Sequence, residues 1–110
     1  GPAEVVMSLR RQLALDVARA HKSAGAGVIA VYHYESSRGE EEGEPVKLLE
    51  VSNETVPAGV LPIYLRPRTD IDLAVVLIEL TAEEFQALEL GELELPNGWD
   101  HRVELLPLVA

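Results

Sequence analysis

Residues 70–91 read DIDLAVVLIELTAEEFQALELG, and this stretch decides the fold. Residues 73–78 are six consecutive apolar residues, rich in β-branched side chains and bounded by acids. A run of this length is too short for a buried helix and is typical of a strand that is buried on both faces. We therefore expect residues 73–78 to form the centre of a sheet.

A short helix is predicted directly after this strand. Thr81 lies three residues before Glu84, so each side chain can bind the backbone amide of the other residue in a capping box. Phe85 and Leu88 are spaced to share one helix face, and Gly91 can adopt the left-handed conformation that ends a helix. A helix of about nine residues is not stable alone, because isolated helices need roughly 12 to 15 residues. It must therefore lie on the sheet.

The segments before residue 53 supply a first helix and two more strands. Ser8 suits the N-cap of a helix that runs to about residue 23, where a glycine-rich segment begins. Residues 28–34 and 46–51 are rich in apolar and β-branched side chains, which predicts strands. The acidic segment between them is expected to be a solvated connection.

Prolines restrict two of the remaining segments to the edges of the sheet. Pro62 interrupts residues 60–65, and proline lacks the amide that an inner strand must donate. Asn97-Gly98 suits a two-residue turn, which predicts a hairpin between the residues on either side. Its second strand should also be an edge strand, because Pro107 interrupts it.

Together these elements give an α+β fold. It is a small single-domain sheet of about four to five strands with two helices, in the order α-β-β-(edge β)-β-α-β. The domain is expected to span residues 7–110, because Gly1-Pro2 resembles the scar of a tag-cleaving protease and Met7 is the only methionine. Residues 1–6 are accordingly assigned to a tag-derived leader. Two helices are few for such a sheet, so either they cover opposite faces or a second copy covers one face in a homodimer.

The net charge of −10 over 110 residues is unevenly distributed. Residues 79–104 contain eight acids and one base, whereas residues 1–24 contain four bases and two acids. A charge this negative argues against broad binding to nucleic acid or to anionic membranes. The absence of cysteine fits a reducing compartment, for which the cytoplasm is the default. No glycine-rich phosphate loop or paired-histidine motif occurs, so no cofactor or metal is expected and no catalytic residue is assigned.

The function predicted from these features is that of a small acidic, non-enzymatic protein-binding module, such as an inhibitor, antitoxin, immunity protein or accessory subunit. An acidic surface steers a partner with a basic surface toward it. The residues expected to contact this partner are Glu89, Glu92, Glu94, Trp99 and Leu15. Both apolar residues have a second interpretation, since Trp99 can cover the core and Leu15 can cover a neighbouring loop.

A ligand-binding or enzymatic domain is the alternative. Arg66 and Arg68 are followed by Asp70 and Asp72, which predicts either mutual pairing or an anion or carboxylate site, with His33 as a further candidate. His33 is more typical of a core or edge residue, because its strand is otherwise apolar. A third hypothesis, a mimic of DNA charge, requires the acids to line one face.

Overall fold

The computed structural model describes the chain except residues 25–26, 39–43, 54–58, 66–72 and 110. Two helices and five strands occur among the described residues. In chain order they are α1 (Pro2–Ser23), β1 (Val28–Glu35), β2 (Val46–Ser52), β3 (Gly59–Leu65), β4 (Leu73–Thr81), α2 (Ala82–Glu89) and β5 (His101–Leu105). Neither helix is both long enough and apolar enough to cross a membrane, as far as the described residues go.

The five strands form one mixed sheet in the order β3-β4-β2-β1-β5. β4 runs parallel to β2, and the other neighbouring pairs are antiparallel. The predicted α+β class is confirmed, and β3 and β5 are the two edge strands. The predicted centre of the sheet was wrong, because β4 is an inner strand but β2 is the middle one, with all seven residues buried. Lys47 and Glu50 are polar, and they concealed the burial of β2 in the sequence.

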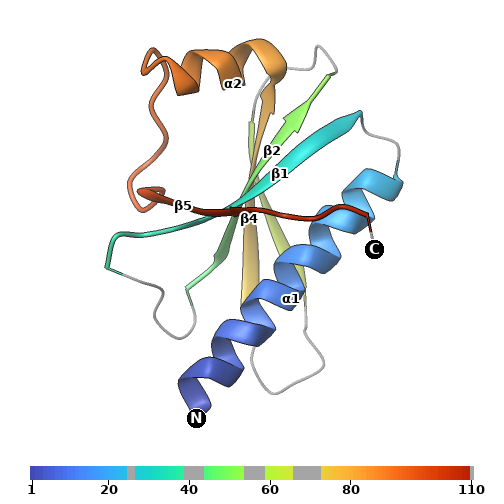
Figure 1. The fold of residues 1–110 in the computed structure, drawn as a ribbon, viewed down its shortest axis with the longest axis vertical. Coiled ribbons are helices and arrows are strands. Elements are labelled where there is room, and N and C mark those ends of the chain that lie inside the picture. Colours follow the sequence, from blue (N-terminus) through green and yellow to red (C-terminus); the bar gives the residue numbers. More distant parts are fainter. Residues whose placement is uncertain (25–26, 39–43, 54–58, 66–72, 110) are drawn as a thin grey trace.

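The two helices cover opposite faces of the sheet. α1 packs against β1 and β2, whereas α2 packs against β4 and β2 (Figure 1). Side chains alternate along each strand, so Leu48 and Leu77 join the core under α1 while Leu49 and Ile78 join the core under α2. The homodimer was inferred as one of two ways to cover the second face. Coverage by a second helix removes that reason for expecting a dimer.

Each face has its own hydrophobic cluster. The core under α1 contains Leu13, Ala14, Leu15, Val17, Ala18, Val28, Val31, Val46, Leu48, Val75, Leu77 and Leu106. The core under α2 contains Tyr34, Leu49, Val51, Ile78, Leu80 and Trp99, with half-buried Phe85 and Leu88 packed against it. The α2 residues that were expected to hold this helix on the sheet therefore do so.

The ends of α2 follow the capping chemistry in the sequence. Thr81 Oγ1 accepts from the Glu84 amide at 3.1 Å, and the Thr81 amide donates to Glu84 Oε1 at 2.9 Å. At the other end Gly91 has φ +77°, and its amide donates to the Leu88 carbonyl at 3.1 Å. Both predictions are confirmed: the capping box fixes where α2 begins, and Gly91 fixes where the chain leaves it.

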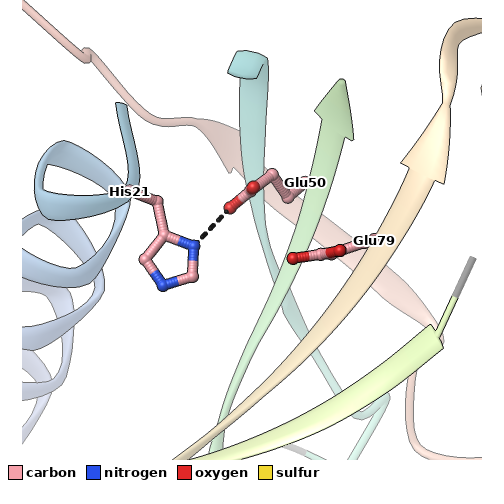
Figure 2. Close-up of side chains that lie close together, drawn as sticks. All are labelled: His21, Glu50 and Glu79. Carbon is pink, nitrogen blue, oxygen red and sulfur yellow. Dashed lines mark hydrogen bonds and ion pairs between the residues drawn. The ribbon is translucent and has the colours of Figure 1, made fainter. Parts of the chain in front are cut away.

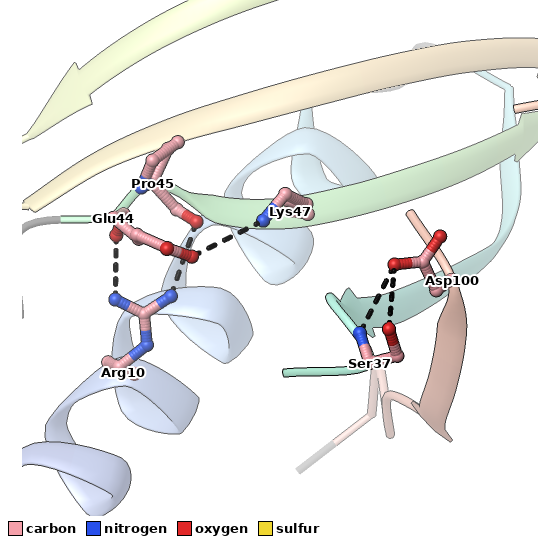
Figure 3. Close-up of polar contacts among 6 residues, drawn as sticks. All are labelled: Arg10, Ser37, Glu44, Pro45, Lys47 and Asp100. Carbon is pink, nitrogen blue, oxygen red and sulfur yellow. Dashed lines mark hydrogen bonds and ion pairs between the residues drawn. The ribbon is translucent and has the colours of Figure 1, made fainter. Parts of the chain in front are cut away.

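The first helix is longer than predicted, because it begins at Pro2 rather than after Ser8. Proline suits the first turn of a helix, where its missing amide costs no hydrogen bond. Arg10 is 1% exposed, and its guanidinium donates to the carbonyl oxygens of Glu44 and Pro45 at 2.7 and 3.2 Å (Figure 3). These bonds attach α1 to the start of β2.

Candidate functional site

An open groove lies between α2, β5 and the connection that joins them. Its volume is about 520 Å³, and we call it the α2–β5 groove. Figure 1 shows the connection leaving the end of α2 and returning to the sheet at β5. The lining residues are Tyr34, Leu88, Glu89, Glu94, Leu95, Pro96, Asn97, Trp99, Asp100 and Arg102.

Part of the groove lining is apolar and aromatic, and we call the part formed by Tyr34, Leu88, Leu95 and Trp99 its floor. Trp99 is 8% exposed, and its ring centroid lies 5.8 Å from that of Tyr34. A turn at Asn97-Gly98 presents Trp99 to the floor, since Gly98 has φ +92° and the Trp99 amide donates to the Pro96 carbonyl at 3.2 Å. The interpretation of Trp99 as a cover over the core is confirmed, because this residue belongs to the core under α2.

The predicted hairpin around Asn97-Gly98 is wrong. The turn exists, but the residues before it form no strand, and β5 pairs with β1 instead. Pro96 supplies the physical reason, because it has no amide to donate to a ladder beside the turn. The chain therefore runs from α2 to β5 as an irregular connection, and this connection forms one wall of the groove.

Arg102 forms the opposite wall and joins the groove to α2. Its Nε donates to the Tyr34 hydroxyl at 2.9 Å, and its Nη2 forms an ion pair with Glu89. The guanidinium carbon lies 4.4 Å from the ring centroid of Tyr32 and 5.4 Å from that of Phe85, and these two rings are stacked at 5.3 Å. A guanidinium over aromatic faces is attracted by their electron density. Arg102 is therefore held by β1 and α2 together.

Three acids line the groove, and they differ in whether their carboxylates contact other side chains. Glu89 is paired with Arg102, and Asp100 Oδ2 accepts from the Ser37 amide and hydroxyl at 3.2 and 3.3 Å (Figure 3). Glu94 is exposed, and no hydrogen bond or ion pair of its carboxylate occurs among the described residues. The Glu94 carboxylate is thus the acid most available to an incoming cation.

The groove collects three of the five residues expected to contact a partner. Glu89, Glu94 and Trp99 line it, whereas Glu92 is exposed on the neighbouring turn and is not part of the lining. Leu15 requires a correction, because it is 5% exposed and belongs to the core under α1. At 100° per residue Leu15 falls on the side of the helix that carries Arg11, Arg19 and Lys22, which concealed its burial, and it offers no exposed contact.

The alternative ligand site cannot be assembled from the described residues. Arg66, Arg68, Asp70 and Asp72 lie outside them, so the anion site stays a prediction from sequence. His33 is buried at 4% exposure on the face of β1 that α1 covers, in keeping with the core interpretation. Its Nε2 has no hydrogen-bond partner within the described part of the chain.

A second cluster was missed in the sequence. His21 Nδ1 lies 2.9 Å from Glu50 Oε2, and one ligand atom each from His21, Glu50 and Glu79 lie within 4.8 Å of one another (Figure 2). Burial raises the pKa of Glu50, which is 2% exposed; His21 opposes this shift, and the charge of Glu79 adds to it. A glutamate inside the otherwise apolar run at residues 46–51 was a signal for such a cluster. The pairing of β2 with β4 was needed to identify its neighbour.

Models of protein families gave no match to this chain, and neither did searches of curated proteins and of solved structures. The function is therefore inferred from the geometry and chemistry of this chain.

Proposed function

We propose that the protein is a non-enzymatic protein-binding module whose α2–β5 groove receives a basic segment of a protein partner. The observation that carries this proposal is the combination of an apolar, aromatic floor with acids along the lining. Such a groove suits a segment in which an arginine or lysine neighbours an apolar side chain. The apolar side chain would fill the groove over Trp99, and the cation would meet Glu94.

Electrostatics support a basic partner. Residues 79–104 contain eight acids and one base, and that base is Arg102, which the protein already uses to hold Glu89 and Tyr34. Glu104 is paired with Arg11 of α1, and within the described part of the chain the other six acids form no ion pair with an arginine or lysine. A negative surface accelerates the association of a positive partner and repels negative ones, including nucleic acid and anionic membranes.

An inhibitor, antitoxin, immunity protein or accessory subunit would act in this way, by occupying a basic surface of its partner. The proposal places the protein in the cytoplasm, without a cofactor. It requires a single copy of the chain, because the groove is lined by residues of one chain. A homodimer is compatible with it but contributes nothing to the groove.

The experiment begins with an unbiased library of displayed peptides selected against the whole protein. We expect the enriched peptides to combine arginine or lysine with leucine, phenylalanine or tryptophan. A synthetic copy of the most enriched peptide then serves as the probe for the variants. Enrichment of acidic peptides would contradict the proposal, because they would be repelled by the groove.

Charge reversal at Glu94 should weaken binding of the selected basic peptide and slow its association. Glu94→Lys places a cation on the groove where the account expects the partner's cation, so we expect a loss of at least about tenfold in affinity. Asp16→Lys is the matched control, since it changes the net charge equally from the exposed surface of α1, on the other face of the sheet. Surface plasmon resonance at several salt concentrations measures both rates. Equal effects of the two reversals would mean that only net charge matters and that the groove is not the site.

A further inference from the structure

Two carboxylates lie side by side on the face of the sheet that α1 covers. Glu50 of β2 and Glu79 of β4 are directly paired in the parallel register, on the same face as Leu48 and Leu77. Like charges on neighbouring strands repel each other. Glu50 is 2% exposed, so water screens this repulsion poorly.

Of these two carboxylates, only that of Glu50 contacts another polar side chain among the described residues. His21, in the last turn of α1, contacts Glu50 through Nδ1 at 2.9 Å. The Glu79 carboxylate forms no hydrogen bond or ion pair with any residue that the structure describes. Lys22, the next residue of α1, donates to the Val28 carbonyl at 2.9 Å. The cluster thus carries two carboxylates and one imidazole, a set that a divalent cation would stabilise.

We propose that His21, Glu50 and Glu79 form a binding site for a divalent transition-metal ion such as Zn²⁺ or Mn²⁺. The imidazole nitrogen and the two carboxylates are the ligand types that these ions take from proteins. Ca²⁺ and Mg²⁺ prefer ligand sets made of oxygen alone, so the histidine disfavours them. The site is distinct from the α2–β5 groove, which lies on the other face of the sheet.

The spacing of the ligand atoms fits this assignment with one local adjustment. Neighbouring ligands of an ion at about 2.1 Å are separated by roughly 3.0 to 3.4 Å. His21 Nδ1 and Glu50 Oε2 are already 2.9 Å apart. The Glu79 oxygen lies within 4.8 Å of the others, so it has to approach by at most roughly 2 Å. Figure 2 shows its side chain beside that of Glu50, and rotation of its flexible side chain can supply this approach.

The positions of the three ligands determine how a metal ion reaches the site and how its binding affects the fold. The His21 side chain is 27% exposed, so an ion can enter from solvent beside the end of α1. Three protein ligands leave coordination positions for water. The ion would tie the last turn of α1 to β2 and β4, and metal binding would therefore raise the stability of the fold.

The first test uses the complete protein, freed of metal, and Zn²⁺ alone as the probe. We expect saturable binding of one Zn²⁺ per chain in isothermal titration. At 100 times its dissociation constant, Zn²⁺ should raise the melting temperature by about 10 °C or more. Mn²⁺ should compete for the site, whereas Mg²⁺ and Ca²⁺ at the same concentration should not.

Glu79→Gln separates the proposal from a purely structural role of the cluster. This variant keeps the shape of the side chain but removes one negative ligand, so Zn²⁺ affinity should fall by at least about tenfold. Without metal its melting temperature should equal or exceed that of the unmodified chain, because the repulsion between neighbouring carboxylates is gone. This result excludes unfolding as the cause of lost binding.

His21→Gln should also abolish the Zn²⁺-induced rise in melting temperature. His101→Gln is the matched control, since His101 is an exposed histidine on β5 that contributes nothing to the cluster. Retention of Zn²⁺ binding in His101→Gln together with its loss in the two cluster variants would support the site. The proposal would be overturned by the absence of saturable binding, by binding in Glu79→Gln equal to that of the unmodified chain, or by loss of binding in His101→Gln.

Discussion

Arg102→Ala should destabilise the protein by about 2 to 3 kcal/mol and lower the melting temperature by roughly 10 °C. The hydrogen bond to the Tyr34 hydroxyl involves a charged donor and supplies the largest share. The contact with the Tyr32 ring adds about 0.5 to 1 kcal/mol, and the Glu89 ion pair adds little because solvent screens it. Chemical denaturation measures the loss. The selected basic peptide should also bind more weakly, because α2 and β5 lose the residue that joins them.

Two further variants test whether the loss of stability comes from the contacts of the Arg102 guanidinium. Arg102→Lys keeps the charge but lacks the planar group that contacts three rings and two acceptors, so it should recover less than half of the lost stability. Arg38→Ala removes an exposed arginine and should change stability by no more than about 0.5 kcal/mol. Full recovery in Arg102→Lys would show that charge alone matters and that the aromatic contacts do not stabilise the wall of the groove.

The second large effect is a loss of stability on acidification that depends on His33. Burial lowers the pKa of His33 from its usual value of 6.5; Glu35 and Glu104 oppose this shift, while Arg10 and Arg11 add to it. The unfolded chain therefore binds a proton near pH 6.5 while the folded chain does not. The contribution of His33 to the free energy of unfolding is therefore complete above pH 6.5. It is lost as the pH falls from 6.5 toward the lower pKa that His33 has in the folded chain. The slope should reach up to about 1.4 kcal/mol per pH unit.

His33→Leu should make the free energy of unfolding depend less steeply on pH when it is measured between pH 7.5 and 5. It should also be at least as stable as the unmodified chain at neutral pH, because it removes a buried nitrogen that lacks a partner among the described residues. His101→Gln, at an exposed position, should leave the slope unchanged. An unchanged slope in His33→Leu would show that His33 is not the group responsible.

Local chemistry in the sequence predicted the parts of the fold that depend on near neighbours. The capping box of Thr81 and Glu84 begins α2 and the left-handed Gly91 follows its end, and each acts on backbone groups only a few residues away. The edge position of β3, which contains Pro62, followed from the inability of proline to donate a hydrogen bond. The edge position of β5 is also confirmed, although this strand ends at Leu105, before the proline on which the prediction was based. Such features can be predicted from the sequence because they do not depend on which strand is the neighbour.

Features that depend on the order of strands in the sheet could not be predicted from the sequence. Residues 73–78 look more buried than residues 46–51, yet β2 is the middle strand and holds two charged residues inside the sheet. The pairing of Glu50 with Glu79 brings together residues 29 positions apart, and no local pattern encodes it. The groove itself was not predicted from the sequence, although three residues of its lining, Glu89, Glu94 and Trp99, are among the residues expected to contact a partner.

The most direct test of the central claim is a map of amide chemical shifts as the selected basic peptide is added to the isotope-labelled protein. The account predicts that the largest shifts occur in the α2–β5 groove, at residues such as Leu88, Glu94, Leu95 and Asp100, and that Glu94→Lys abolishes them. Shifts centred on α1, or shifts in the groove that persist in Glu94→Lys, would contradict the proposal that this groove receives a basic partner.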